Sequence, residues 1–254
     1  MREIQMVDLK AQYEKIGPEI DKAIKSVLES TAFIKGPDVK LFEEELQEYM
    51  GVKHVVSCAN GTEALYLAMM VLGLKPGDEV ITTNFTFIAT VEVVALLGLK
   101  LVIVDPEPGT FNISVEAVKK AITRRTKVIV PVHLFGQCAD MESLMELAQK
   151  HNLFVIEDAA QATGADYIFR DGSVKKAGTI GHIGTTSFFP SKNLGCYGDG
   201  GALYTNDDAF AKKLKSIANH GLKVRYNDGD LGVNSRLDAI QAENMRKNIK
   251  YLTK

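Results

Sequence analysis

The chain has no tryptophan, and its 254 residues include only three cysteines and seven prolines. The cysteines, Cys58, Cys138 and Cys196, are too far apart for a C-x-x-C pair. Their number and spacing argue against a disulfide framework and a zinc motif, so we expect no metal site. Sparse, odd-numbered cysteines are typical of a reducing compartment, and we expect a cytoplasmic protein.

Long apolar runs and an excess of one charge are also missing. The longest apolar stretch, residues 64–74, is well short of the ~20 residues that span a bilayer. Residues 1–15 lack the apolar segment of a secretory signal. Lys and Arg total 30 and Asp and Glu total 32, for a net charge of −2. We therefore expect neither a nucleic-acid nor a membrane partner.

Short runs rich in Val and Ile alternate with helical patterns along the chain. Because most of these runs show no polar alternation, they resemble strands that are buried on both faces. The pattern predicts an α/β protein with a mostly parallel, seven-stranded sheet and ligands at the carboxyl ends of its strands. The expected strands are 54–57, 79–82, 100–104, 127–131, 154–157, 186–189 and 202–205. The expected helices are 37–50, 61–72, 86–97, 114–122, 141–150 and 207–219.

Three divisions of the chain follow from this pattern: an N-terminal segment (1–20), a large domain (21–236) and the start of a helix (237–254). The last segment carries an apolar stripe with no following element to pack on, which suggests the start of a connecting helix to something absent. We expect residues 170–178 to form a surface hairpin or another surface excursion. Residues 221–232 should form a long loop, a kind that is often functional.

Lys192 is the first candidate for chemistry. It follows an expected strand and Pro190, and four glycines lie within residues 195–201. An arbitrary loop lysine is usually solvated, but apolar and glycine-rich surroundings suggest a close approach of other groups. A lysine held in this way could form a Schiff base with a carbonyl cofactor.

Glu157 and Asp158 end a buried strand, and we expect one of them to face the crevice above the sheet. A buried carboxylate needs a cationic partner, and a protonated pyridine nitrogen would serve. The alternative is an acid that interacts with a helix dipole.

Two further strand ends carry possible ligand groups. The sequence Asn60-Gly61-Thr62 opens a helix, where free amides could hold a phosphate or where Asn60 or Thr62 could simply cap the helix. Phe85 and Phe87 follow another strand, and either ring could stack on a planar group or lie in the core.

The four segments SCANGTEAL, TTNFTFIAT, FVIEDAAQATG and FFPSKNLGCYGDGGA, together with GVNSRLD, resemble the DegT/DnrJ/EryC1/StrS sugar aminotransferases. That family uses pyridoxal 5′-phosphate (PLP), and the resemblance implies the large domain of the aspartate aminotransferase-like fold, PLP fold type I. It covers nearly the whole chain. The large domain, residues 21–236, would then bind PLP.

The resemblance implies a role for individual residues. Lys192 would form the Schiff base and shuttle the proton, Asp158 would pair with the pyridine nitrogen, and Gln161 would lie near the ring hydroxyl. Phe87 would stack on the ring. The phosphate would contact Gly61, Thr62, the Glu63 backbone, Ser187 and, from the neighbouring subunit of a homodimer, Asn234.

The implied reaction moves an amino group from an amino acid, typically glutamate, to a nucleotide-linked keto sugar for amino-sugar or cell-surface polysaccharide synthesis. The motifs look most like the branch that aminates C3 of UDP-2-acetamido-3-oxo sugars, including the uronate. Arg236 could bind a sugar carboxylate or phosphate, or form an interface salt bridge. Tyr197 and His133 could line the site or be structural.

Three other functions compete with this one. A truncated, catalytically impaired PLP-binding or regulatory member of the family would fit the early chain end and the loop at Tyr226, which lacks the usual histidine. A PLP-dependent sugar dehydratase would have histidine at position 192. A dinucleotide-dependent oxidoreductase would need G-x-G-x-x-G after the first strand, which ANGTEAL does not supply.

Overall fold

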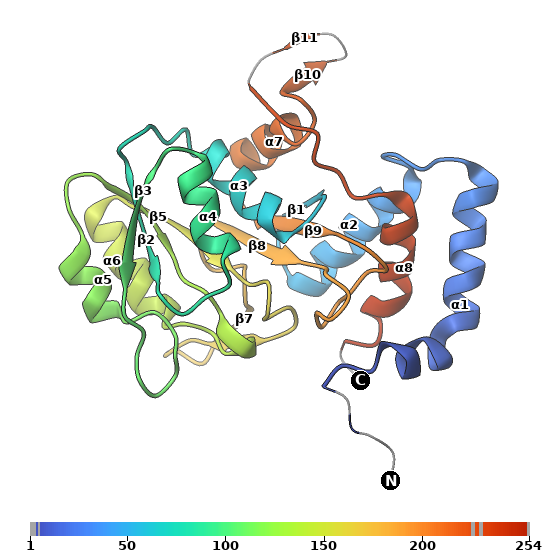
Figure 1. Cartoon of the computed structure of the whole chain (residues 1–254), viewed down its shortest axis with the longest axis horizontal. Coiled ribbons are helices and arrows are strands. Elements are labelled where there is room, and N and C mark those ends of the chain that lie inside the picture. The colour runs from blue at the N-terminus through green and yellow to red at the C-terminus, as the bar shows by residue number, and fades with distance from the viewer. Residues whose placement is uncertain (1–3, 5, 225–226, 229–230, 253–254) are drawn as a thin grey trace.

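The computed structural model describes residues 4, 6–224, 227–228 and 231–252. Its centre is a seven-stranded sheet in the order β1-β9-β8-β5-β4-β2-β3 (Figure 1). All neighbouring strands are parallel except at β9, which runs antiparallel to both β1 and β8. The predicted mostly parallel, seven-stranded sheet is therefore confirmed. The strands are β1 (His54–Cys58), β2 (Glu79–Thr83), β3 (Lys100–Val104), β4 (Thr126–Val130), β5 (Phe154–Asp158), β8 (Ile183–Ser187) and β9 (Gly201–Thr205).

Helices cover both faces of the sheet. One face packs against α3 (Gly61–Val71), α4 (Ala89–Leu96) and α7 (Asp208–Ile217). The other packs against α2 (Pro37–Met50), α5 (Val115–Ala121) and α6 (Met141–His151). Neighbouring strand residues divide between the two layers, as Val55 and Val56 do. This division explains why the buried strands are continuous apolar runs, since both faces are covered.

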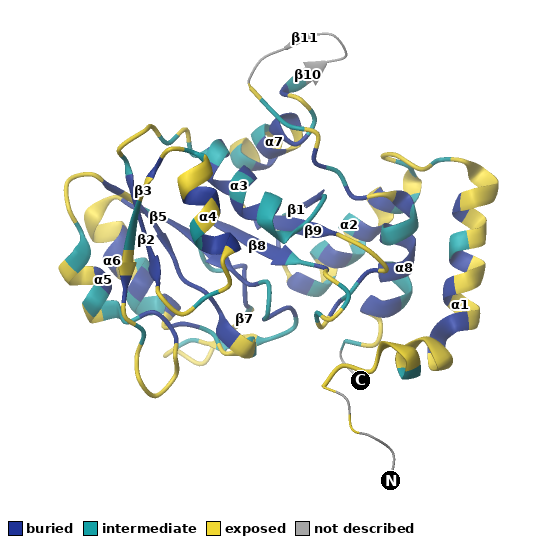
Figure 2. Cartoon of the chain, viewed as in Figure 1, coloured by how far each residue is buried: buried dark blue, intermediate teal, exposed yellow. Residues whose placement is uncertain are grey.

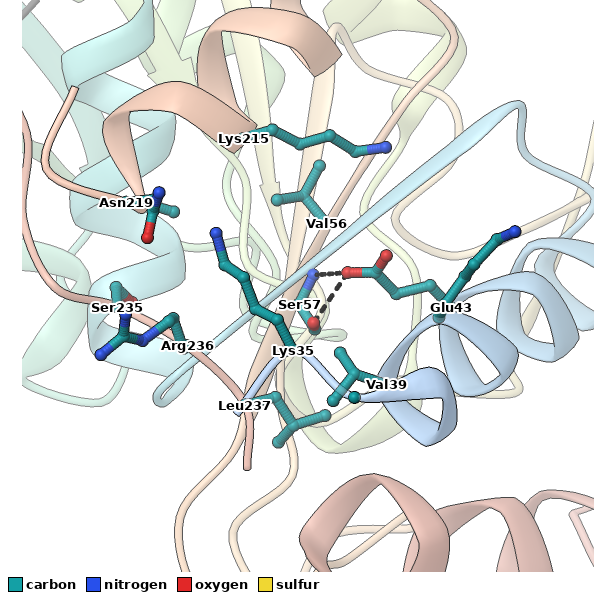
Figure 3. Close-up of a pocket in the computed structure, with 13 residues that line it drawn as sticks. Lys35, Val39, Glu43, Val56, Ser57, Lys215, Asn219, Ser235, Arg236 and Leu237 are labelled. Atoms are coloured by element: carbon teal, nitrogen blue, oxygen red, sulfur yellow. Dashed lines mark hydrogen bonds between the residues drawn. The ribbon is translucent and has the colours of Figure 1, made fainter. Parts of the chain in front are cut away.

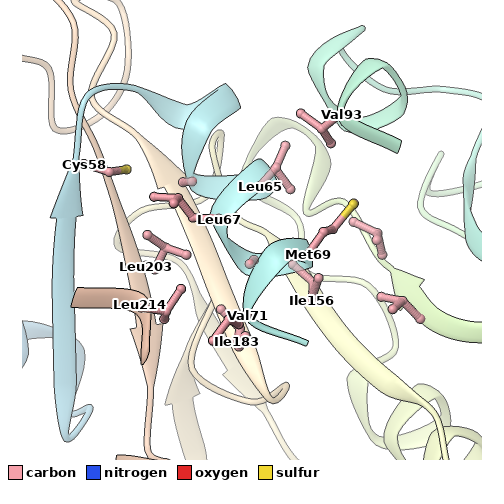
Figure 4. Close-up of a cluster of buried hydrophobic side chains, with 14 of the residues drawn as sticks. Cys58, Leu65, Leu67, Met69, Val71, Val93, Ile156, Ile183, Leu203 and Leu214 are labelled. Carbon is pink, nitrogen blue, oxygen red and sulfur yellow. The ribbon is translucent and has the colours of Figure 1, made fainter. Parts of the chain in front are cut away.

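The largest apolar cluster lies beneath α3 (Figure 4). Leu65, Leu67 and Met69 from this helix meet Ile156 and Leu203 from the sheet and are at most 2% exposed. Because α3 is buried on nearly all sides, its first turn is held rigidly above the carboxyl edge of the sheet. That edge carries the candidate site.

Two long helices complete the molecule beside β1. Helix α1 (Leu9–Ser30) lies outermost, and α8 (Ala239–Ile249) lies between α1 and α2 (Figure 1). The outer side of α1 is largely exposed (Figure 2). Met245 and Ile249 of α8 join the cluster beneath α2, so the C-terminal apolar stripe packs on elements of this chain. The sequence analysis divided the chain between residues 20 and 21. In the structure, helix α1 continues across this point without a break.

Several sequence predictions need correction. Strand β8 begins and ends earlier than the predicted 186–189, and α4 begins at Ala89, three residues after the predicted start. The edge strand β3 is not buried on both faces, since Ile103 is 51% exposed. The expected long loop at 221–232 instead contains β10 (Leu222–Val224) and β11 (Asn227–Asp228), which pair. Tyr226 lies outside the described residues.

Of the two alternatives for residues 170–178, the hairpin is present, but it begins earlier, at Asp166. It is formed by the antiparallel strands β6 (Asp166–Ile168) and β7 (Val174–Lys176). A short 3-10 helix, η1 (Leu134–Gly136), follows β4. Among the described residues, no helix is both long and apolar enough to cross a membrane.

Candidate active site

A cavity of about 600 Å³ opens at the carboxyl edge of the sheet, beside the first turn of α3. We call it the Lys192 cavity. Eight of the nine residues that the family resemblance implies in catalysis or cofactor binding line it, and they come from four separate segments of the chain. These eight are Gly61, Thr62, Glu63, Phe87, Asp158, Gln161, Ser187 and Lys192.

Lys192 reaches the cavity from the turn that follows β8. Its amide donates to the carbonyl of Phe189 at 2.8 Å, which fixes the tight turn after Pro190. Gly195 allows the next turn, because a Cβ there would lie 2.4 Å from the Pro190 carbonyl oxygen. Burial lowers the pKa of Lys192, and the negative charge of Asp158 partly opposes this shift. A lysine with a lowered pKa is a better nucleophile at neutral pH.

Asp158, not Glu157, is the strand-end acid that faces the cavity. It is 5% exposed. Its Oδ2 accepts a 2.7 Å hydrogen bond from the Thr90 hydroxyl, and its Oδ1 accepts one from the Ala160 amide at 3.2 Å. The carboxylate is therefore fixed in orientation, with lone pairs left for a cationic group in the cavity.

Glu157 faces away from the cavity and has a different task. Its Oε2 lies 2.8 Å from His133 Nε2, and its carboxylate accepts amides of Gly178, Ile180 and Gly181. Burial raises its pKa, but the hydrogen bond and charge of His133 and the amides outweigh this, so the net pKa is lowered. His133 is fully buried and its Nδ1 accepts the Ala139 amide at 3.1 Å. A site-lining role for His133 is therefore wrong.

The first turn of α3 combines a cap with free amides. The Asn60 side chain accepts a hydrogen bond from the Glu63 amide at 2.8 Å. Asn60 therefore caps the helix, as one of the two alternatives for this sequence predicted. The Gly61 and Thr62 amides have no acceptor within the described part of the chain. These two amides, rather than that of Glu63, are available to an anion. A Cβ on Gly61 would lie 2.6 Å from the Ser187 Cβ, so the helix start and β8 touch there.

Neither Phe85 nor Phe87 lies in the core, which was one of the two alternatives for these rings. Phe87 is 67% exposed and lines the cavity. Phe85 packs against Phe111 and Phe135, with ring centroids 5.5 and 6.4 Å away. Phe87 is therefore the ring that is free to cover a planar ligand.

Three of the expected residues lie elsewhere. Tyr197 packs against Tyr13, and its backbone exchanges hydrogen bonds with the Gln241 side chain. Asn234 is exposed and pairs with Asn219 in a backbone bridge. Arg236 lines a different cavity (Figure 3). None of the three lines the Lys192 cavity of its own subunit.

Sequence reasoning missed several residues of the cavity. Thr86 lines it and shares a 2.8 Å hydrogen bond with Thr90, the donor to Asp158. Thr86 precedes α4, which begins at Ala89, so helical spacing does not place its side chain. Asp199 also lines the cavity. The sequence analysis considered the neighbouring glycines but not this carboxylate. Glu63 Oε2 is buried without a partner.

The described part of the chain has no group of three or more His, Cys, Asp or Glu side chains arranged to hold a metal ion. The groups that line the Lys192 cavity instead suit an organic ligand. The cavity offers an amine, a carboxylate, an exposed aromatic ring and an amide pair, arranged around one volume. Such a site can hold an anionic group, a cationic nitrogen and a carbonyl at the same time.

Known proteins that are similar to this chain include enzymes whose chemistry would use such groups. Residues 14–254 match the DegT/DnrJ/EryC1/StrS aminotransferase family, and the chain belongs to that family. It is 49% identical over 94% of its length to a UDP-2-acetamido-2-deoxy-3-oxo-D-glucuronate aminotransferase from Pseudomonas aeruginosa. It is also 49% identical over 94% to a pleiotropic regulatory protein from Geobacillus stearothermophilus.

Solved structures give the same fold. A family aminotransferase from Brucella abortus superposes with a TM-score of 0.94 at 42% identity, covering 98% of this chain and 68% of that one. The Bacillus subtilis protein ntda, with bound cofactor PMP, gives 0.89 at 33% identity, covering 99% and 57%. The fold is thus that of the PLP-dependent aminotransferases. The chain spans 65% and 63% of the two curated relatives.

Proposed function

We propose that this chain carries the PLP site of an aminotransferase that acts on a nucleotide-linked keto sugar. The observation that carries the proposal is the convergence of four sequence-distant segments, centred on Lys192 and Asp158, on one cavity. The relative that acts on a UDP-linked 3-oxo sugar supports this substrate class. The expected cytoplasmic location rests on the cysteine content.

The residues present fit this cofactor. The free amides of Gly61 and Thr62, at the positive end of α3, would hold its phosphate together with the Ser187 hydroxyl. Asp158, fixed by Thr90, would keep the ring nitrogen protonated. Phe87 would cover the exposed face of the ring.

PLP supplies, when bound, an electron sink that stabilises a carbanion next to nitrogen. The chain's part is to position groups and to move a proton. Lys192 Nζ, with its pKa lowered by burial, would take the proton from the carbon that bears the amino group and return it on the opposite half-reaction. The amino donor, expected to be glutamate, and the keto sugar would use the same cavity in turn.

The direct test is borohydride reduction after incubation with PLP, followed by peptide mass spectrometry. We expect a phosphopyridoxyl adduct on Lys192 and none at this peptide in Lys192→Ala. Lys212, an exposed lysine outside the cavity, gives the background level of labelling. Absence of the Lys192 adduct in protein shown to be folded would refute the proposal.

We further propose a homodimer with a shared site. Asn234 supports this, because it is exposed and lies away from its own subunit's cavity, where it is free to reach the cavity of a neighbour. Light scattering should give twice the chain mass of 27.8 kDa. Mixing inactive Lys192→Ala with Asn234→Ala should then restore one competent site per mixed dimer. A monomeric mass, or no restoration, would contradict sharing.

The sugar itself is proposed to be a UDP-2-acetamido-3-oxo sugar, on the strength of one relative. Amino transfer from glutamate to the 3-oxo sugar, with and without the uronate carboxylate, tests this choice. Because Arg236 lies outside the Lys192 cavity, recognition of the carboxylate by Arg236 of the same subunit is not part of the proposal. One relative is named a pleiotropic regulatory protein, but the presence of Lys192 and Asp158 in one cavity supports the enzyme rather than the regulatory alternative.

A further inference from the structure

The loop that joins β8 to β9, residues 188–200, carries Lys192, and we call it the Lys192 loop. Its two ends are fixed at the carboxyl edge of the sheet, because β8 and β9 pair directly with each other. The Phe188 amide continues this pairing by donating to the Gly200 carbonyl at 2.8 Å. The position of Lys192 therefore depends on the contacts that hold the middle of the loop.

The second half of the Lys192 loop is held from two sides. The Cys196 amide donates to the Phe188 carbonyl at 2.8 Å, and the Cys196 thiol lies 3.0 Å from the same oxygen. The Gln241 side chain of α8 accepts from the Tyr197 amide at 2.8 Å and donates to the Tyr197 carbonyl at 3.1 Å. Both anchors act beyond Lys192, so they leave the start of the loop to other contacts.

Asn193, the residue directly after Lys192, holds the start of the loop. Its Nδ2 donates to the Thr163 carbonyl at 3.0 Å. Thr163 belongs to the segment that follows β5 and that begins just after Asp158. Within the described part of the chain, Asn193 is the one residue of 190–195 whose side chain forms a hydrogen bond. This bond ties the backbone next to Lys192 to the segment of Asp158.

Thr163 is a firm anchor for this bond. It is 4% exposed, and its hydroxyl lies 2.9 Å from the hydroxyl of Thr186 in β8. The Ala159 amide donates to the Thr185 carbonyl at 2.9 Å, which fixes the start of the same segment on β8. Because close-packed parts of a protein move little against each other, the Asn193 hydrogen bond fixes the loop relative to the sheet.

We propose that Asn193 positions Lys192: through its hydrogen bond to Thr163, it holds the start of the loop so that the Lys192 amine stays beside Asp158. The proposal rests on the proposed function, since Lys192 is the amine that would bond to PLP and move the proton. A side chain on a loosely held backbone spends less time in the geometry that proton transfer needs. Burial lowers the pKa of Lys192, so an amine released from this place regains water and its ordinary pKa.

The test compares Asn193→Ala with Asn206→Ala. Both residues are exposed asparagines whose side chains hydrogen-bond to the backbone of a distant segment. Asn206 Oδ1 accepts the Lys53 amide at 2.9 Å, but Asn206 follows the far end of β9, at the opposite edge of the sheet from the Lys192 loop. Each variant loses one such bond, so urea unfolding should show a similar, small loss of stability in both. A difference at Lys192 then reports position and not stability.

The first readout needs no cofactor. Acetylation of Lys192 is measured by peptide mass spectrometry at a series of pH values. In Asn193→Ala the pH of half-maximal rate should rise toward that of a short lysine peptide, because a less buried amine keeps its charge to higher pH. In Asn206→Ala it should stay at the wild-type value. The half-maximal pH, unlike the rate itself, does not depend on how easily the reagent reaches the amine.

The second readout is the apparent affinity for PLP, from the borohydride-trapped adduct on Lys192 as a function of PLP concentration. We expect the affinity to fall about two- to tenfold in Asn193→Ala and less than about twofold in Asn206→Ala. Asn193→Gln, which keeps an amide donor, should recover about half or more of each effect. If Asn193→Ala does not fold, Asn193→Ser, whose side chain is too short to reach the carbonyl, takes its place.

Three outcomes would overturn the proposal: an unchanged half-maximal pH and affinity in Asn193→Ala, equal changes in Asn206→Ala, or no recovery in Asn193→Gln. Failure of the proposed function is read separately, from adduct formation in the wild-type protein. If Lys192 forms the adduct but Asn193→Ala behaves as the wild type, the positioning role fails and the proposed function stands. If Lys192 forms no adduct, the acetylation series still measures what Asn193 does to the amine.

Discussion

At the scale of single residues, the chemistry of the site depends on what surrounds each titratable group. Lys192 lies half-buried beside the Asp158 carboxylate, while most lysines of the chain are exposed. Burial disfavours its charged form, so more of the free amine is present at a given pH. The same side chain on an open loop would be a poor nucleophile at neutral pH.

The lowered pKa of Lys192 predicts its reactivity in the absence of PLP. Acetylation of Lys192 should reach its half-maximal rate at a lower pH than acetylation of a short lysine peptide in the same tube. The sign follows because only the uncharged amine reacts, and burial favours that form. Rates at a series of pH values, read by mass spectrometry, check this. A half-maximal pH at or above that of the peptide would contradict it.

Thr90 is a positioning residue for Asp158. Thr90→Val removes the 2.7 Å hydrogen bond within a fully buried site and keeps the side-chain shape. We expect the apparent affinity for PLP to fall about tenfold, because a hydrogen bond to a charged group is lost. Thr90→Ser, which keeps the hydroxyl, should restore most of the affinity. The extent of adduct formation on Lys192, measured as a function of PLP concentration, gives the apparent affinity of each variant. An equal loss of affinity in the two variants would indicate that Thr90 acts through packing alone.

At the scale of elements, the start of α3 is held against β8 with no space between them. Gly61→Ala would place a Cβ 2.6 Å from the Ser187 Cβ, so either the helix or the strand must shift. We expect a loss of about 1–3 kcal/mol in the free energy of unfolding. Gly109→Ala is the matched control, since nothing lies within 4 Å of its added Cβ. Urea unfolding measures both, and equal stabilities would contradict the close contact.

The sheet was predictable from sequence because its strands are buried apolar runs separated by helices. Strand β8 was placed too late, since Phe188 and Phe189 favour a strand by composition although pairing with β9 ends at Ser187. Helix α1 was missed altogether. Its buried positions Ile16 and Ile20 have helical spacing, but Gly17 and Pro18 interrupt the pattern locally, and only packing against α8 compensates.

The residues of the Lys192 cavity were predictable only in part, because some of them are brought together by tertiary packing. Residues that follow strand ends, such as Asp158, can be placed by topology, because parallel strands end at one edge. Thr90, by contrast, reaches Asp158 from another segment, 68 positions away. Lys35 and Arg236 meet through a backbone bridge that no local pattern predicts. Contacts set by tertiary packing cannot be found from propensity.

At the scale of the whole molecule, one buried acid ties the far end of the sheet together. The Glu79 carboxylate accepts hydrogen bonds from Thr123, Lys100 and Arg125, with Arg125 Nη2 at 2.9 Å. The Thr123 hydrogen bond above all lowers the pKa of Glu79, despite the opposing effect of burial, to about 2. β2, β3 and the turn before β4 are thereby joined at one point.

Glu79 predicts how stability depends on pH. Because its pKa is lower in the folded chain than the ordinary 4.5, its stabilisation is complete above about pH 4.5 and is lost as the pH falls toward 2. We expect Glu79→Gln to cost about 2 kcal/mol at pH 7 and less at pH 3. Urea unfolding of both proteins at the two pH values checks this. A difference that does not shrink at pH 3 would contradict the assignment.

The packing of α8 between α1 and α2 has a consequence for the order in which the chain is made. During synthesis on the ribosome, α2 emerges about 200 residues before α8, which must cover its apolar side. At ordinary elongation rates of about 5–20 residues per second, that side stays uncovered for some ten seconds or more. The nascent chain is therefore exposed to chaperones and to aggregation at Phe42 and Leu46 until α8 has left the exit tunnel.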